Sequence, residues 1–181
     1  LGVLDAIYPP LSRVTHLRTA FNAILSQNQP SPVTYLALLA WILTPEETTG
    51  LIRRLKLTSR QSKVVQDTQT IKGILPDLAS SSLSPSRLYE MLSQVMPEAI
   101  QAAKSASISP LVRKRLKRFS EKLRFVKPFL SGNNLLKLGV PNGPDIGKLL
   151  THLFRARLDG DIKTLTQEIK IVRDYVEENS S

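Results

Sequence analysis

The stretch Thr44–Gln61 reads TPEETTGLIRRLKLTSRQ, and it contains two helix beginnings of the same kind. In each, a threonine stands three residues before a glutamate or a glutamine, at Thr44–Glu47 and at Thr58–Gln61. In such a capping box the threonine side chain bonds the backbone of the third helical residue, whose own side chain bonds back to the threonine backbone. The stretch therefore predicts two successive helices joined by a short turn.

Helix beginnings of related kinds recur along the chain. A hydroxyl residue directly precedes a proline at Thr44-Pro45, Ser84-Pro85 and Ser109-Pro110, and a third capping box is found at Thr164–Gln167. Proline suits the first helical position because the N–H that it lacks would have no helical partner there. Between these beginnings apolar residues recur at intervals of three and four, and no segment sustains an interval of two. We therefore predict an all-α protein, an irregular and elongated bundle of about nine or ten helices.

Composition limits the classes of function. The 181 residues include no cysteine, which excludes a disulfide framework, a thiolate metal site and a cysteine nucleophile, and we expect a cytoplasmic protein. The longest apolar run, Tyr35–Leu43, is shorter than the roughly 18 residues of a membrane span, so no membrane partner is predicted. Because the sequence begins with leucine, we expect a piece of a longer chain.

Positive charge is concentrated in one part of the sequence. The net charge is +10, and nine basic residues and one acidic residue lie between Lys104 and Lys127, which leaves only +2 for the remainder. Charge localised in this way is typical of proteins that bind a polyanion.

The basic region is predicted to be one amphipathic helix, from Ser109 to Val126. We expect its apolar residues to face the core, namely Leu111, Leu116, Phe119 and Leu123. Lys114, Arg118 and Lys122 follow one another at intervals of four, about 12 Å from end to end, which is long enough to meet about two or three phosphates. Other cations widen this ladder, namely Arg113, Lys117, Arg124 and Lys127. Only Glu121, four positions after Lys117, opposes this charge within the region, so we predict contact with a nucleic-acid backbone; the alternatives are a solvated helix or one lying on an anionic membrane.

Two further groups of residues are candidates for phosphate binding. One surrounds the turn between the two helices of the opening stretch and consists of Arg53, Arg54, Lys56, Arg60 and Lys63. The other is the beginning of a helix near Pro144, with Gly143, Gly147 and Lys148. A helix N-terminus offers unpaired N–H groups to an anion, and glycines let a phosphate approach. The alternative is that Gly147 lets this helix pack closely against Leu135–Leu138.

No catalytic residue or metal ligand is predicted in this sequence. His16 and His152 stand alone and are interpreted as ordinary helix residues. Asp159-Gly160-Asp161 has the spacing of carboxylates that hold Mg²⁺, but we interpret it as a glycine helix end with solvated carboxylates. No phosphate-binding loop, nucleophile elbow or zinc spacing is present.

Three segments of the sequence resemble a known family. Phe129–Ile162, FLSGNNLLKLGVPNGPDIGKLLTHLFRARLDGDI, is similar to the tail of class II bacterial tRNA nucleotidyltransferases, the CCA-adding, A-adding and poly(A) polymerase enzymes. The matching positions are Gly132, Leu135, Leu138, Gly139, Gly143, Pro144, Ile146, Gly147 and Leu150. Asn134 stands where the family has aspartate and Asn142 where it has proline, so contacts of those two residues are not carried over. Thr44–Gln61 and Ser84–Leu92 look like segments of the family's helical body.

The resemblance implies a body-and-tail region that holds tRNA while a catalytic head and neck, absent from this sequence, add nucleotides to the 3′ end. Residues 1–12 would end the neck, 13–128 would form the helical body and 129–181 the helical tail. Mg²⁺ and CTP or ATP would bind only the missing head and neck, and this region would need no cofactor. The alternatives are a DNA-binding module of helix–hairpin–helix type and a protein-interaction or dimerisation module that associates with itself or an acidic surface.

Overall fold

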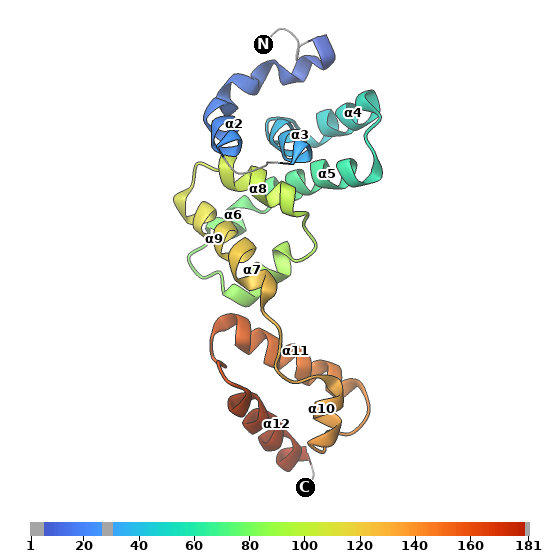
Figure 1. Ribbon diagram of the computed structural model, residues 1–181, viewed down its shortest axis with the longest axis vertical. Helices are drawn as coiled ribbons and strands as arrows, with labels where there is room; N and C mark the ends of the chain where they lie inside the picture. The colour runs from blue at the N-terminus through green and yellow to red at the C-terminus, as the bar shows by residue number, and fades with distance from the viewer. Residues whose placement is uncertain (1–5, 27–30, 180–181) are drawn as a thin grey trace. The chain divides into compact units, whose positions relative to one another are not determined.

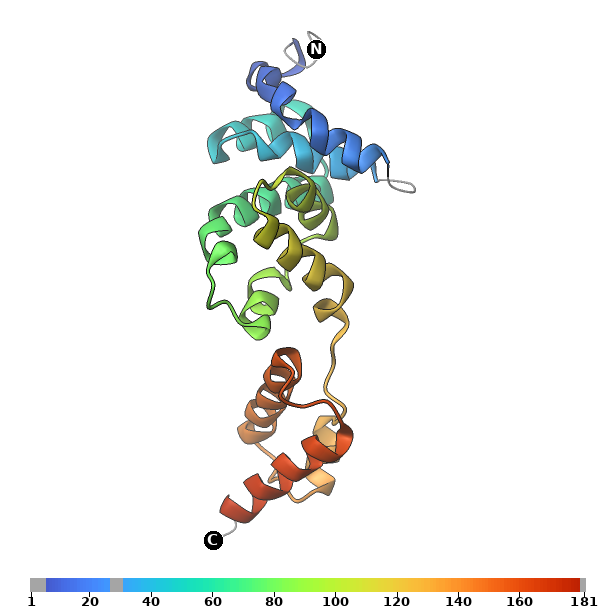
Figure 2. The same cartoon turned by 90° about the vertical axis from the view of Figure 1, so that its left-hand side faces the viewer.

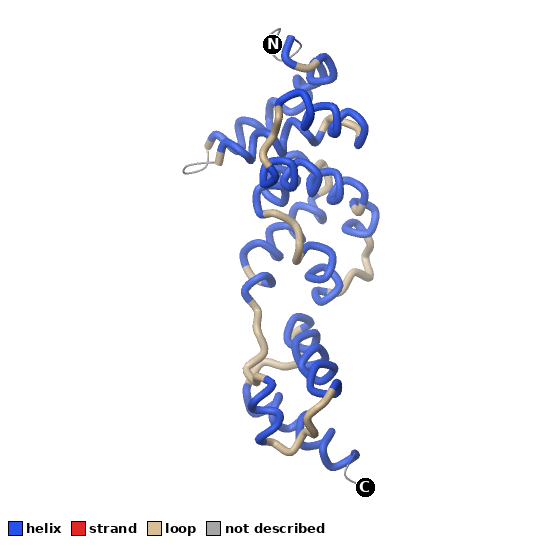
Figure 3. Tube along the Cα trace, turned by 90° about the vertical axis from the view of Figure 1, so that its right-hand side faces the viewer, coloured by secondary structure: helices blue, strands red, loops and turns tan. Residues whose placement is uncertain are grey.

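The computed structural model describes residues 6–26 and 31–179, and these residues form helices and loops without a strand (Figures 1 and 3). The α-helices are α2 (Arg18–Leu25), α3 (Pro32–Trp41), α4 (Pro45–Leu55), α5 (Ser59–Gly73), α6 (Leu75–Ala79), α7 (Pro85–Leu92), α8 (Pro97–Ala106), α9 (Pro110–Glu121), α10 (Gly132–Lys137), α11 (Pro144–Asp159) and α12 (Leu165–Asn179). Two 3-10 helices, η1 (Pro9–Leu17) and η2 (Leu123–Phe125), complete the described part. The all-α prediction is confirmed, with eleven α-helices described where about nine or ten were expected.

Local sequence signals explain where the helices begin. Both capping boxes of the opening stretch are formed, one by Thr44 with Glu47 and the other by Thr58 with Gln61. Between them α4 ends at Leu55, and the next residue, Lys56, has a left-handed backbone with a φ of 48° that turns the chain toward α5. Thr164 and Gln167 also exchange bonds, since the Gln167 backbone donates to the Thr164 hydroxyl at 3.3 Å.

The chain divides into two compact units. Unit 1 comprises Leu1–Leu83 and Leu92–Ser120, and unit 2 comprises Ser84–Met91 and Glu121–Ser181. Most of α7 thus belongs with the C-terminal helices. The predicted division at residues 12 and 128 stays a prediction, and residues 1–5 of the expected neck end lie outside the described part.

Unit 1 is built around three helices that pack on one another, α3, α5 and α8, with α2 against α8 (Figures 1 and 2). Alanines on α3 and α8 allow close approach, among them Ala37 and Ala103, both fully buried. The Gln69 side chain of α5 donates to the Ala40 carbonyl at 2.7 Å and to the Leu43 carbonyl at 3.3 Å. These bonds tie α5 to carbonyls at and just beyond the end of α3.

Unit 2 has its own core. The fully buried side chains of Leu135, Leu153 and Val172 bring α10, α11 and α12 together. The α7 segment is held against α11 by polar and aromatic contacts. The Ser86 backbone donates to the Asp159 carboxylate at 2.8 Å, Arg155 pairs with Glu90 at 2.7 Å, and the Tyr89 and Phe154 rings meet edge to face at 4.9 Å.

A buried carboxylate fixes the entry of the chain into this core. Glu168 of α12 is fully buried and accepts backbone bonds from Phe129 and Leu130 at 2.9 and 2.8 Å. The Arg157 guanidinium lies 3.6 Å from the Glu168 carboxylate and 3.6 Å from the centre of the Phe129 ring. Glu168 therefore holds the segment before α10 against α11 and α12.

Candidate nucleic-acid interface

The buried edge of α9 determines which of its cations point outward. Val112, Leu116 and Phe119 are buried, and their spacing of four and three places them on one side of the helix. Leu111 was predicted to face the core, and this was wrong, because it is 40% exposed. Leu111 lies about 100° around the helix from Val112 and five residues from Leu116, so it is not on the buried side of the helix.

The exposed side of α9 carries four cations, Arg113, Lys114, Lys117 and Arg118, which we call the α9 basic face. The pairs Lys114–Arg118 and Arg113–Lys117 are each one helical turn apart, about 6 Å along the axis. Arg113 also donates to the Ser107 carbonyl at 3.4 Å. The other three form no ion pair with any carboxylate of the described residues, whose salt bridges lie elsewhere.

One cation of the predicted ladder, Lys122, lies outside the helix. The helix was expected to continue to Val126, but α9 ends at Glu121, and Lys122 has φ −128° and ψ −63°, which is not helical. Of the three predicted residues, Lys114 and Arg118 therefore lie on consecutive turns of α9, and Lys122 lies outside the helix. Arg115, on the same helix, is used internally, since it donates to the Leu78 carbonyl of unit 1 at 2.7 Å.

Three predicted cations lie beyond α9, in the first residues of unit 2. Lys122, Arg124 and Lys127 are all exposed around η2. None of them has an ion-pair partner among the described residues. Sequence reasoning did not single out the aromatic residue among them, Phe125, which is 68% exposed. The sequence signal for its exposure was its position. Phe125 follows Leu123 by two residues, whereas the buried apolar residues recur at intervals of three or four.

The cations near the α4–α5 turn mostly bond to the protein itself. Arg54 donates to the Ile7 and Ala6 carbonyls, and Arg60 pairs with Glu98 at 2.6 Å. Lys63 pairs with Asp67 at 2.5 Å. Arg53 and Lys56 remain exposed without such a partner in the described residues. The structure thus leaves this group with less charge for a ligand than the α9 basic face.

The glycines at the start of α11 are open to solvent. A Cβ at Gly147 would meet no atom within 4 Å, so the alternative that Gly147 allows close helix packing was wrong. Close contact occurs instead at Gly132, where a Cβ would lie 3.4 Å from Ile146. Gly143 is extended, with φ 162°.

The first turn of α11 already contains an anion. The Lys148 ammonium donates to the Asp145 carboxylate at 2.8 Å, and this hydrogen bond raises the pKa of Lys148. The Asp145 carboxylate lies at the positive end of the helix dipole, where a phosphate would otherwise bind. Gly143, Gly147 and Lys148 are therefore a weaker candidate for phosphate than α9.

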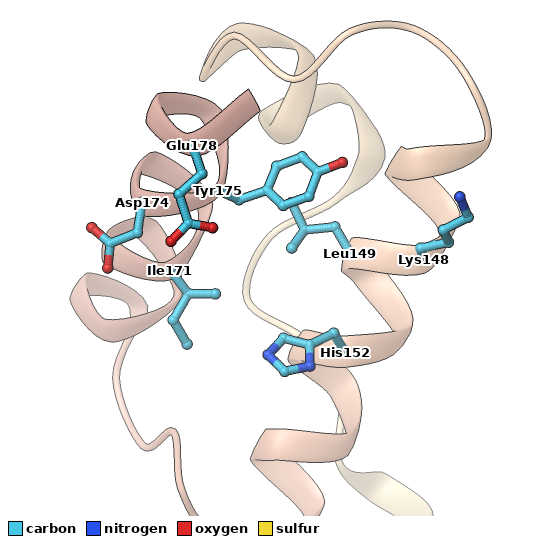
Figure 4. Close-up of a pocket in the computed structure, with 7 residues that line it drawn as sticks. All are labelled: Lys148, Leu149, His152, Ile171, Asp174, Tyr175 and Glu178. Atoms are coloured by element: carbon cyan, nitrogen blue, oxygen red, sulfur yellow. The ribbon is translucent and has the colours of Figure 1, made fainter. Parts of the chain in front are cut away.

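A groove of about 410 Å³ runs between α11 and α12 within unit 2 (Figure 4). The Tyr175 ring extends from α12 toward α11, and His152 lies on the α11 side. The carboxylates of Asp174 and Glu178 stay on the α12 side. Acidic groups along one wall oppose the binding of an anion in this groove.

The aspartates near Gly160 do not fit a Mg²⁺ site. Gly160 ends α11 in the left-handed conformation with φ 93°, as predicted. Asp159 was expected to be solvated, and this was wrong, because its carboxylate accepts the Ser86 backbone bond that orients α7. No group of three histidine, cysteine, aspartate or glutamate residues in the described part of the chain could hold a metal ion. His16 is exposed in η1.

Within residues 6–26 and 31–179, each helix is too short or too polar to span a lipid bilayer.

Comparisons with known proteins give one similarity along nearly the whole chain. The chain is 24% identical over 188 residues to the A-adding tRNA nucleotidyltransferase of Geobacter sulfurreducens (strain ATCC 51573 / DSM 12127 / PCA). The alignment covers 94% of this chain but only 21% of that protein, so the chain spans about a fifth of the relative's length. No protein-family model matches the chain, and no solved structure matches it at a significant level. The match supports a relationship to the tRNA nucleotidyltransferases.

Proposed function

We propose that this chain is the non-catalytic, tRNA-holding body and tail region of a class II tRNA nucleotidyltransferase. Its head and neck, outside this sequence, would bind Mg²⁺ and CTP or ATP and add CMP or AMP to the tRNA 3′ end. The similarity to an A-adding enzyme along 94% of the chain supports the assignment. The residues described above contribute binding and no chemical step.

The α9 basic face is the observation that carries this proposal. Lys114, Lys117 and Arg118 are exposed, lie within two helical turns and are not neutralised by a described carboxylate. Phosphate groups would relieve the repulsion between these cations. Double-stranded RNA suits such a surface because proteins contact its phosphates and 2′-hydroxyls by shape, without reading bases.

The test is the salt dependence of tRNA binding by the 181-residue chain. Each phosphate neutralised contributes roughly 0.9 to the slope of log affinity against log salt concentration. Replacing Lys114, Lys117 and Arg118 together by alanine is expected to reduce the magnitude of this slope by about two to three units. The matched control replaces three exposed cations outside the predicted site, Lys163, Lys170 and Arg173. An equal slope for the wild type and the α9 variant, or an equal effect of both variants, contradicts the proposal.

Competition distinguishes the helix–hairpin–helix alternative. Duplex DNA of matched length should displace tRNA less well than unlabelled tRNA does, because the proposed surface follows A-form geometry. Preference for DNA would reject the assignment to tRNA.

A further inference from the structure

We propose that Phe125 is a stacking platform for an unpaired base of the bound RNA. The inference rests on the proposed function and specifies one part of the ligand that this chain contacts. Phe125 is 68% exposed, although a phenylalanine ring in water is unfavourable unless a partner covers it. A nucleobase has a flat π-face that such a ring can cover.

The backbone around Phe125 is fixed, so the ring is presented without a large ordering cost. Leu123 is 4% exposed and anchors η2. The Phe125 backbone donates to the Lys122 carbonyl at 3.1 Å, and the Val126 backbone donates to the Leu123 carbonyl at 3.0 Å. These bonds close a tight turn with Leu123 inside and Phe125 outside.

The charges beside the ring favour a nucleic acid as its partner. Lys122–Lys127 reads KLRFVK, with three cations and no acidic residue. The Arg124 guanidinium carbon lies 5.8 Å from the centre of the Phe125 ring, at the outer range of a cation–π contact. An aromatic ring with cations on both sides in the chain can stack a base while the cations meet its neighbouring phosphates. Sequence-specific and single-stranded RNA contacts commonly take this form.

The other exposed apolar residues of unit 2 do not offer the same surface. Phe129 is 49% exposed, but the Arg157 guanidinium already lies 3.6 Å from its ring centre. Leu136 and Leu165 are exposed without an aromatic ring. Phe125 is therefore the residue on which the proposal depends.

The experiment compares two RNA hairpins that differ only in a short unpaired 3′ extension, bound to the 181-residue chain and two variants. Phe125→Leu retains apolar bulk and removes the π-face, whereas Phe125→Trp retains the π-face. Phe125→Leu is expected to weaken binding of the extended hairpin by about 5- to 150-fold, since stacking stabilises by about 1–3 kcal/mol per base. Binding of the blunt hairpin and the salt slope should not change, because no phosphate contact is lost.

Phe125→Trp should bind like the wild type, and its indole emission should be quenched by the extended hairpin. The wild type is the control for this quenching, because its single tryptophan, Trp41, belongs to unit 1 and not to the segment around position 125. A fluorescent adenine analogue in the extension should report the same stacking from the RNA side.

Failure of this inference differs from failure of the proposed function. If the wild type binds RNA with a steep salt slope and Phe125→Leu binds the extended hairpin equally well, Phe125 is not a platform and the proposed function stands. If the wild type binds neither hairpin nor tRNA, both proposals are wrong. Loss of self-association in Phe125→Leu by sedimentation, with RNA affinity unchanged, assigns the ring to a protein interface and overturns the inference.

Discussion

At the scale of single residues, Glu168 is a buried side chain that holds together two parts of unit 2. Its buried carboxylate accepts the backbone N–H groups of Phe129 and Leu130, which no helix would otherwise satisfy. Arg157, which is largely buried, supplies the opposite charge. Removing one partner of such an arrangement costs more than its formation contributes, because the remaining groups are left buried and unpaired.

We predict that Glu168→Gln lowers the free energy of unfolding of unit 2 by about 2–4 kcal/mol. The glutamine retains one acceptor oxygen but loses the charge that faces Arg157. Urea denaturation followed by circular dichroism measures the effect. Glu178→Gln, an exposed carboxylate on the same helix, is the matched control and should change stability by less than about 0.5 kcal/mol. Equal stability of both variants would show that the buried bonds do not hold the segment.

Glu47 gives a prediction about pH. The Thr44 backbone N–H bond, assisted by Arg13, lowers the pKa of Glu47 below its ordinary 4.5. A carboxyl whose folded pKa is depressed adds stability above its unfolded pKa, and this is lost as the pH falls through the folded value. Glu47→Gln should therefore reduce stability at pH 7 by about 0.3–1 kcal/mol and make little difference near pH 2–3. Urea denaturation at both pH values checks this, with Glu121→Gln, an exposed glutamate that has no ion pair in the described residues, as the matched control; the same loss at pH 7 in both variants contradicts the prediction.

At the scale of elements, α11 contains a glycine that its packing does not require. Gly147 is exposed, lies in the first turns of the helix and has open space where a Cβ would stand. Glycine costs a helix roughly 0.5–1 kcal/mol relative to alanine.

We predict that Gly147→Ala raises the free energy of unfolding by about 0.5–1 kcal/mol, as measured by urea denaturation. Binding of tRNA by the same variant then tests the predicted phosphate contact. An unchanged affinity removes Gly147 from the candidate site, whereas a loss of affinity in a more stable protein indicates that the ligand approaches the bare backbone.

The elements also show why some expectations were correct and others wrong. Capping boxes are local, so Thr44 and Thr58 fixed two helix beginnings from a few neighbouring residues. Leu123 is buried as its spacing predicted, yet α9 ends before it, at Glu121, so the apolar pattern predicted the burial correctly and the helix end wrongly. Asp159 was interpreted as solvated because its partner, the Ser86 backbone, lies 73 residues away in the chain.

The candidate site, like the fold, could be predicted only where it depends on neighbouring residues. Exposure of Lys114, Lys117 and Arg118 follows from the apolar pattern of their own helix. The partners of Arg54, Arg60 and Arg115 are groups remote in sequence, so sequence reasoning could not separate these structural cations from cations available to a ligand.

At the scale of the whole molecule, unit 2 is assembled from two separate parts of the chain. A fragment of residues 129–181, the predicted tail, would lack Ser84–Met91. It would lose the Ser86–Asp159 hydrogen bond, the Glu90–Arg155 ion pair and the Tyr89–Phe154 ring contact.

We predict that this fragment exchanges the backbone amides of the last two turns of α11 at least roughly tenfold faster than the full chain does, because local opening costs less when packing is removed. Hydrogen exchange of both proteins under the same conditions measures the difference. The amides of α10, which α7 does not hold, provide the internal comparison. Identical protection along α11 would mean that the tail is complete without α7.

The divided origin of unit 2 also has a consequence for biosynthesis. A ribosome adds about 5–20 residues per second, and 73 positions separate Ser86 from Asp159, so α7 leaves the exit tunnel about 4–15 seconds before its partner helix. During this interval Tyr89, whose ring meets Phe154 of α11 edge to face in the finished fold, has no α11 to pack against. Nascent chains of this protein should therefore present a chaperone-accessible apolar segment at α7 until the C-terminal helices are translated.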